Sequence, residues 1–260
     1  MMKYTAKHRF TLVELIVVMT IMGIMMAIAL PAFTGISKGQ ELNNAAQEIA
    51  GQISIARAYA MANHAYVAVV FPQAEELNAL PGSESDKNKS ALINFYNASC
   101  RIALVTKISS GEYQFVMWKN DSPWIILQAG TMIPTGDSYF KTMNKKLKNV
   151  RMGDLIKLYK STPTAADMEE EMDIKRYIII RPDGQLVADG NTVESGLSGH
   201  SNKKVIRVTV MEGGYYYNNA SKKYELRKFE RAKTNGKHAY QSVEFDQLTG
   251  RVLGHKSDLE

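Results

Sequence analysis

The sequence contains a single cysteine, Cys100, so no disulfide can form within one chain. The five histidines are scattered, and neither they nor the cysteine show the H-x-x-x-H or C-x-x-C spacing of a zinc site. No glycine-rich phosphate loop is present, and residues 196–200 lack the G-x-S-x-G spacing of a hydrolase nucleophile. The acidic run at 169–173 lacks the alternating ligands of a calcium loop. We therefore predict that the protein is not an enzyme and holds no metal or cofactor.

Neither basic nor acidic residues are in large excess, since 32 Lys and Arg against 26 Asp and Glu give a net charge of +6. One basic cluster lies close to three consecutive tyrosines, Tyr215–Tyr217, and cations interleaved with aromatic rings can bind DNA through its phosphates and bases. The other interpretation is a strand edge guarded by lysine. The candidate DNA-binding residues are Lys222, Lys223, Arg227, Lys228 and Arg231.

A long apolar run extends from Phe10 to Phe33 and follows a short basic leader. At about 1.5 Å per residue, the stretch 12–30 approaches the ~30 Å thickness of the hydrocarbon core of a membrane. The excess of basic residues before the run places the N-terminus in the cytoplasm. We therefore expect a single transmembrane helix over residues 10–32, with the rest of the chain on the far side of the membrane.

Glu14 is the only charged residue inside this run. A carboxylate in a bilayer helix costs on the order of 2.5–3.5 kcal/mol at the centre and less near the interface. One interpretation is a glutamate that reaches the interface with its side chain. The other is that Glu14 meets a cation in an assembly, such as the terminal amino group of a neighbouring copy.

The basic leader, the sequence Phe-Thr-Leu-Val-Glu-Leu at 10–15 and the apolar helix together resemble the class III signal of type IV pilins and type II secretion pseudopilins. The resemblance implies that a prepilin peptidase cuts between Arg9 and Phe10 and that the new terminus of Phe10 is methylated. It also implies that Glu14 pairs with an N-terminal amine during filament assembly. Gly23 and Pro31 match helix-loosening positions of the family. Arg9 departs from the family, which prefers glycine before the cut.

A second cleavage site competes with this one. Residues 27–29, Ala-Ile-Ala, form the A-x-A pattern of an ordinary secretory signal peptidase, and a cut there would give a mature chain that starts at Leu30. Against it, the apolar run is long for a signal peptide and contains Glu14.

Beyond residue 40 the helical pattern becomes amphipathic, because Leu42, Ala46, Ile49, Ile53, Ala56 and Ala60 recur at steps of three and four. The stretch 55–62, followed by a strand-like segment at 66–71, is similar to the minor pilins grouped as FimT and GspH. Short segments rich in β-branched and aromatic residues follow, separated by turn formers, and they predict strands that include 113–118 and 174–180. Two of them, at 178–187 and 243–252, each contain an Asp and a Gly in a tight hairpin turn.

These patterns predict an α+β fold with a long N-terminal α-helix, transmembrane in its first half and amphipathic in its second, packed on an antiparallel β-sheet head. The expected parts are a leader at 1–9, a transmembrane helix at 10–32, its amphipathic continuation at 33–63 and a periplasmic β-rich head at 64–260.

The resemblance implies a structural subunit, a minor pilin or pseudopilin of a type IV pilus or type II secretion pseudopilus. It would cross a bacterial inner membrane once, with a cytoplasmic N-terminus and a periplasmic head, and would be processed by prepilin peptidase and assembled through its N-terminal helix. The implied partners are other pilin or pseudopilin subunits, the peptidase, an inner-membrane assembly platform with its ATPase, and membrane lipid. The alternative function is a pilus-tip or envelope binding module whose basic head captures DNA or another surface polymer.

Overall fold

The computed structural model describes residues 11–73, 95–108, 112–134, 146–151, 171–187, 194–195, 204–218, 223–228 and 240–257. Within these ranges it describes only the backbone for residues 28–39, 194–195, 204, 215–217, 223–228 and 255–257. The chain forms two compact units, Met1–Glu41 and Leu42–Glu260. One helix, α1 (Leu12–Asn63), contributes residues to both units, and all of the strands belong to the second.

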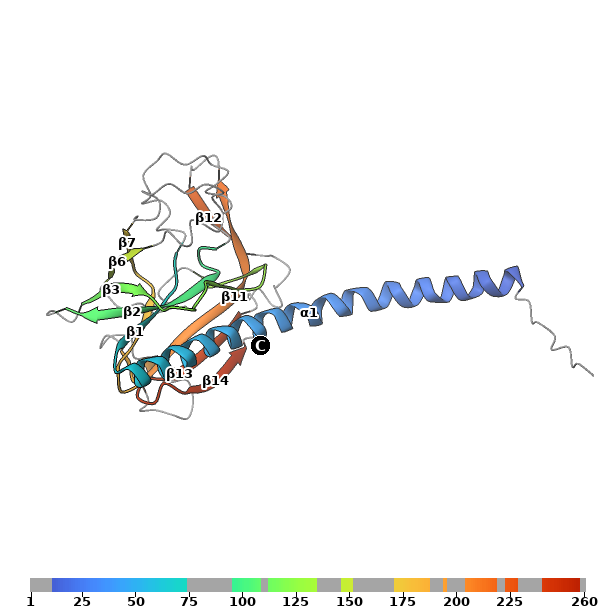
Figure 1. Cartoon of the computed structure of the whole chain (residues 1–260). Helices are drawn as coiled ribbons and strands as arrows, with labels where there is room; N and C mark the ends of the chain where they lie inside the picture. Colours follow the sequence, from blue (N-terminus) through green and yellow to red (C-terminus); the bar gives the residue numbers. More distant parts are fainter. Residues whose placement is uncertain are drawn as a thin grey trace, which may run out of the picture. The chain divides into compact units, whose positions relative to one another are not determined.

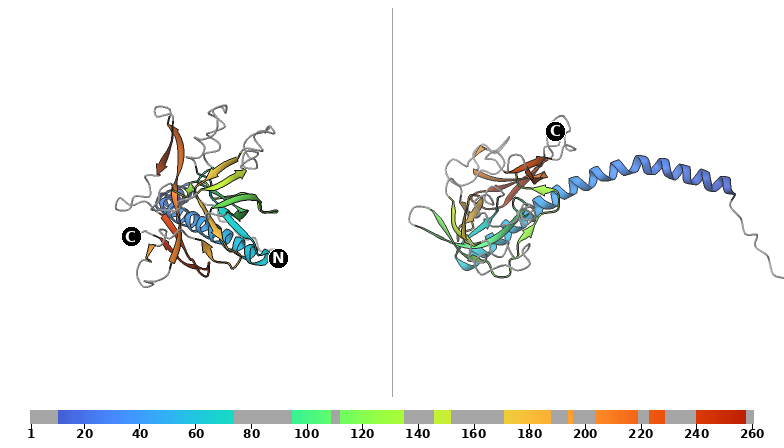
Figure 2. Two further views of the ribbon diagram at one scale, coloured as in Figure 1. Left: turned by 90° about the vertical axis from the view of Figure 1, so that its left-hand side faces the viewer. Right: turned by 90° about the horizontal axis from the view of Figure 1, so that it is seen from above.

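The part of α1 that belongs to the second unit is amphipathic. Its buried side chains recur at steps of one, three and four, which places them on one face of the helix. This face packs on β-strands, because a single apolar cluster joins it to residues such as Val69, Ile180, Val210 and Phe245. Both Figure 1 and Figure 2 show the later turns of α1 lying against the strands. The buried residues of this face are Leu42, Ala45, Ala46, Ile49, Ala50, Ile53, Ala56 and Ala60.

The larger sheet has eight strands in the order β7-β6-β3-β2-β1-β8-β9, with β4 paired to β2. Among the described strands its pairings are antiparallel, except that β3 and β6 run parallel. The bounds are β1 (Tyr66–Val70), β2 (Ser99–Lys107), β3 (Tyr113–Trp118), β4 (Ile125–Ile126), β6 (Leu147–Arg151), β7 (Glu171–Ile174), β8 (Tyr177–Ile180) and β9 (Leu186–Val187).

The smaller sheet has six strands, in which β10, β11, β13 and β14 follow one another and both β5 and β12 pair with β11. Residue Val205 of β11 lies opposite Asp246 of β13, and Met211 lies opposite Tyr240. The bounds are β5 (Thr131–Met132), β10 (Glu194–Ser195), β11 (Lys204–Asn218), β12 (Lys223–Lys228), β13 (Tyr240–Asp246) and β14 (Val252–Ser257).

Central strands of the larger sheet are buried on both faces. In β1, Val67 and Val69 join the cluster under α1, whereas Ala68 and Val70 join a second cluster on the opposite face. This explains why β1 and β8 read as continuous apolar runs rather than as alternating ones.

The prediction of an α+β fold, with a long helix packed on one antiparallel sheet, is wrong. The described part of the chain is mostly strand, in two sheets rather than one, and it includes a parallel pair. Only the later part of α1 belongs to the compact unit that contains the sheets. The physical reason is that the apolar stripe of α1 can cover only one face of the larger sheet. The opposite face is also buried, in the second apolar cluster, and α1 contributes no residue to that cluster.

The predicted transmembrane helix at residues 10–32 is also wrong. Within the described residues, no helix has both the length and the apolar character needed to cross a membrane. The predicted location, with a single pass through an inner membrane, a cytoplasmic N-terminus and a periplasmic head, is wrong for the same reason.

Both predicted hairpins are confirmed, and they meet at one arginine of α1. Gly184 follows β8 with φ 81°, and Gly250 follows β13 with φ 62°. Arg57 Nε donates a hydrogen bond to the carbonyl of Gly184 at 3.1 Å. A Cβ atom at Gly250 would lie 2.8 Å from Arg57 Cδ and 3.0 Å from the Gly184 carbonyl oxygen. The glycines therefore permit both the left-handed turns and the close packing of the two hairpins on the helix.

We expect Gly250→Ala to lower the free energy of unfolding more than Gly130→Ala does. Both residues have positive φ, which costs an alanine roughly 1–2 kcal/mol. A Cβ at Gly130 would meet no heavy atom within 4 Å, whereas at Gly250 it would overlap Arg57 and Gly184, at a further cost of about 1–3 kcal/mol. Urea unfolding of the two variants measures the difference, and equal losses would contradict this account of the hairpin contact.

Candidate functional site

The first turns of α1 expose large apolar side chains around the whole helix. Leu12 is 76% exposed, and even Val17, the least exposed of the set, is 49% exposed. A helix that packs on one side only would bury a stripe of these residues. Contiguous apolar surface of this extent marks a site of interaction. The exposed residues are Leu12, Val13, Leu15, Ile16, Val17, Val18, Met19, Ile21, Met22, Ile24, Met25 and Met26.

Thr11 and Glu14 cap the start of this helix. The Thr11 backbone N–H and hydroxyl each donate to Glu14 Oε2 at 2.9 Å, and the Glu14 N–H donates to Thr11 Oγ1 at 3.3 Å. This reciprocal arrangement is a capping box, which satisfies backbone donors that the first helical turn leaves without partners. The spacing Thr-x-x-Glu before an apolar run is the sequence signal that indicates such a box.

The capping contacts also set the ionisation of Glu14. The hydrogen bond from the Thr11 backbone, followed by that from the Thr11 hydroxyl, holds the pKa of Glu14 below its ordinary value, against a small opposing effect of desolvation. The side chain is fully exposed in the single chain. Glu14 is therefore a solvated carboxylate with a local partner, and its predicted pairing with another copy stays a prediction.

The structure gives few contacts for the other residues predicted from the family motif. Arg9 and Phe10, on either side of the predicted cleavage site, lie outside the described residues. Gly23 lies in the exposed apolar stretch, and a Cβ there would meet nothing within 4 Å. Pro31 lies within α1, whose helical hydrogen-bonding pattern continues through it. No contact within the described chain therefore explains the glycine.

Part of the predicted basic cluster lies on β12, which pairs with the end of β11 that carries the tyrosines. The register places Gly214 opposite Arg227 and Tyr217 opposite Tyr224. The structure describes only the backbone of Lys223, Arg227 and Lys228, and Lys222 and Arg231 lie outside the described residues. DNA binding by this cluster stays a prediction.

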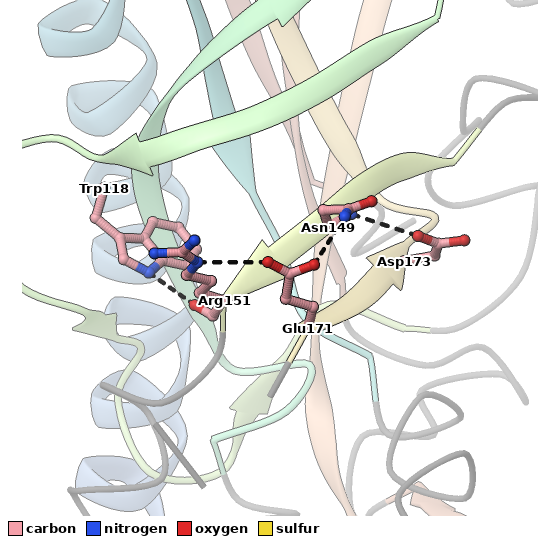
Figure 3. Close-up of polar contacts among 5 residues, drawn as sticks. All are labelled: Trp118, Asn149, Arg151, Glu171 and Asp173. Carbon is pink, nitrogen blue, oxygen red and sulfur yellow. Dashed lines mark hydrogen bonds and ion pairs between the residues drawn. The ribbon is translucent and has the colours of Figure 1, made fainter. Parts of the chain in front are cut away.

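An aromatic and polar cluster, which the sequence did not reveal, surrounds Trp118. The ring contacts Phe115 and Trp124 at centroid distances of 4.9 and 5.0 Å, and the Arg101 guanidinium lies 4.9 Å from its centroid. Trp118 Nε1 donates to the carbonyl of Arg151 at 2.8 Å (Figure 3). Because its own chain already packs against the ring on several sides, we interpret Trp118 as a structural residue that connects β3 to β6, rather than as a binding platform.

The same close-up shows how β6 and β7 are joined. Glu171 accepts from Asn149 Nδ2 at 2.7 Å and pairs with Arg151 at 3.5 Å, and the Asn149 N–H donates to Asp173 at 3.4 Å (Figure 3). Since these ionic side chains are largely exposed, the pair contributes little to stability, about 0–1 kcal/mol. The cluster fixes the register of two strands and needs no ligand.

Cys100 is a buried thiol. Burial raises its pKa to about 12, and the nearby negative charge of Glu48 adds to the shift. A thiol that stays protonated at neutral pH is neither a nucleophile nor a metal ligand.

Comparisons with protein families, with curated proteins and with solved structures find no match for this chain. The resemblance to pilins therefore depends on the residues of the chain itself and stays a prediction.

We expect Thr11→Val to raise the pKa of Glu14, because the substitution removes one of the two hydrogen bonds that lower it. Since the folded pKa is depressed, the cap stabilises the helix start above about pH 4.3, the ordinary glutamate value, and the contribution is lost as pH falls through the pKa of Glu14. Carboxyl NMR titration of the full chain measures both effects.

Thr20→Val is the matched control, because the Thr20 hydroxyl donates to the Ile16 carbonyl and does not contact Glu14. A Glu14 pKa that responds equally to the two substitutions would rule out the capping box as the cause of the shift.

Proposed function

We propose that the protein is a structural subunit of a pilin-like filament, a minor pilin or pseudopilin, and that it assembles through the start of α1. The observation that carries this proposal is the apolar surface at 12–26, which its own chain leaves in water. The motif at 10–15 supports the same function by resemblance. Processing before Phe10 and handling by an assembly platform with its ATPase depend on that resemblance alone.

The energetics favour several neighbours over one. Covering one face of the helix would bury about four of these side chains, at roughly 1.5–3 kcal/mol each. Association costs about 4–15 kcal/mol in lost freedom of motion, so one helix contact is marginal. Contacts on all sides, as in the core of a helical filament, bury the remaining side chains and exceed that cost.

Glu14 has a second role in this proposal. The capping box gives Oε2 of the carboxylate two hydrogen bonds but leaves its negative charge in place. Inside a bundle of apolar helices water no longer solvates that charge, and an unpaired buried charge is strongly destabilising. A positive terminal amine from a neighbouring copy, at Phe10 if the leader is removed, is the counter-charge that the resemblance implies. The pair would also fix the axial stagger between helices.

We expect Glu14→Gln to impair assembly and to leave the fold of the single chain intact. Glutamine also serves at the last position of a Thr-x-x-Glu/Gln capping box, so the helix start is retained while the charge is lost. Thr11→Val is the complementary variant, because it weakens the cap and keeps the charge. Sedimentation and electron microscopy of the full-length protein measure assembly, and circular dichroism measures helix content.

If charge pairing drives assembly, the Gln variant sediments far less than the wild type, whereas the Val variant assembles. The reverse order, with Gln assembling normally and Val failing, would show that Glu14 acts only as a cap.

A further inference from the structure

Methionine is concentrated at the start of α1. Four of the 14 methionines of the chain lie within eight residues of one another, and their side chains are 59% to 67% exposed in the single chain. Their spacing of three, four and seven residues along the helix places them on one face, together with Leu15. We call this surface the methionine face, and its members are Met19, Met22, Met25 and Met26.

The opposite half of the same helix has a different chemistry. Its apolar side chains are β-branched hydrocarbons, which a hydroperoxide does not attack in neutral water. A thioether does react with a hydroperoxide under those conditions and becomes a sulfoxide. The start of α1 therefore has one face that can be oxidised and one that cannot. The β-branched side chains of the second face are those of Val13, Ile16, Val17, Ile21 and Ile24.

Oxidation of these methionines by hydrogen peroxide is a two-electron step. The sulfur lone pair attacks one oxygen atom of the peroxide, so that an S–O bond forms while the O–O bond breaks. The leaving hydroxide takes the proton of the transferred oxygen and departs as water. Sulfur is oxidised and the peroxide is reduced. The product carries a polar oxygen that accepts hydrogen bonds, in place of an apolar sulfur.

The described start of the helix has no spare side-chain hydroxyl to donate to a sulfoxide. The Thr20 hydroxyl already donates to the carbonyl of Ile16 at 2.8 Å. The Thr11 hydroxyl donates to Glu14 at 2.9 Å, and the backbone N–H groups beside the methionines belong to the helix. Water would solvate a sulfoxide in the single chain, but between packed helices of this sequence its oxygen would lack a partner. One such buried group weakens association roughly ten- to hundredfold.

We propose that the methionine face is a redox-sensitive switch of assembly. A hydroperoxide that oxidises these thioethers keeps the subunit dispersed, and reduction of the sulfoxides restores assembly. This inference rests on the proposed function, because the switch acts on assembly through the start of α1. Reduction takes two electrons from a pair of thiols and releases the oxygen as water, and each of the two sulfoxide epimers needs its own reductase.

Controlled oxidation of the full-length protein tests the switch. Dispersed protein is treated with hydrogen peroxide, catalase removes the excess, and sedimentation over a concentration series measures assembly while peptide mass spectrometry counts the sulfoxides. We expect the concentration needed for assembly to rise at least roughly tenfold. It should return to the untreated value when reductases for both epimers are added with dithiothreitol. Cys100 is buried and stays a thiol, so it does not contribute to the effect.

The matched control replaces all four residues of the methionine face by leucine, which keeps their apolar character and removes the sulfur. Every other methionine is retained, so peroxide should leave the assembly concentration of this variant unchanged. Met117→Leu removes a methionine of the second unit that is 50% exposed, and this variant should respond to peroxide as the wild type does. Equal losses of assembly in the wild type and in the four-leucine variant would overturn the switch.

A pair of single variants tests the same change of polarity without an oxidant. Met22→Gln places a polar amide on the methionine face, whereas Met22→Leu does not. The glutamine variant should need a roughly tenfold higher concentration for assembly than the leucine variant. Equal concentrations would overturn the switch, and this comparison decides the matter if the four-leucine variant does not assemble.

The outcomes separate the switch from the proposed function. If the oxidised wild type carries the four sulfoxides and assembles like the untreated protein, the switch is overturned and the proposed function stands. If the untreated wild type does not assemble, the proposed function is contradicted and the switch is overturned with it.

Discussion

The start of α1 presents about a dozen apolar side chains to water, and no described residue of the first unit covers them. The later part of the same helix has the opposite property, because its apolar residues form one stripe that both sheets bury. One helix therefore carries a surface that is satisfied within the chain and a surface that needs a partner. The hydrophobic effect favours the burial of both surfaces. We therefore expect the exposed surface at the start of α1 to be the one that contacts other molecules.

Glu14 has one role in the single chain and a second, proposed role in the assembly. In the single chain it completes the capping box with Thr11 and begins the helix that carries the apolar surface. In an assembly the same carboxylate would lie where water is excluded, so its charge would need a partner. Capping requires hydrogen-bonding atoms and pairing requires charge, and a single residue can serve both needs without conflict.

The second unit has its own constraint. Two hairpins meet at Arg57, and their glycines allow a contact that a Cβ atom would block. This contact fixes the position of the turn that exposes Leu248. The fold therefore holds the exposed Leu248 at one end of β13 and, at the other end of β11, a pocket of about 360 Å³ whose described lining residues carry no charge.

Sequence patterns with local causes were the most predictable. The helical stripe from Leu42 to Ala60 and the hairpins at Gly184 and Gly250 follow from spacing and turn chemistry, and β3 (Tyr113–Trp118) was predicted to its end residues. The predicted strand at 174–180 is confirmed only in part: β8 covers 177–180, and the buried Arg176, which donates to the carbonyl of Pro134, separates it from β7.

Features that depend on distant pairing were not predictable. Strand β6 has only two apolar residues in five, and its parallel pairing with β3 is specified by no local pattern. The pocket likewise forms only where three separate segments meet. The membrane prediction failed because hydropathy along the sequence was taken as a span, whereas no described helix meets the requirements for one.

The central claim is that copies of the same helix cover the apolar start of α1. A nitroxide spin label on Met19→Cys tests it directly, since Met19 is exposed in the single chain and Cys100 is buried. In the assembled protein we expect an immobilised label whose spectrum is broadened by nearby labels and sharpens when unlabelled protein is mixed in. A mobile, unbroadened spectrum in sedimented assemblies, identical to that of the dispersed protein, would contradict the claim.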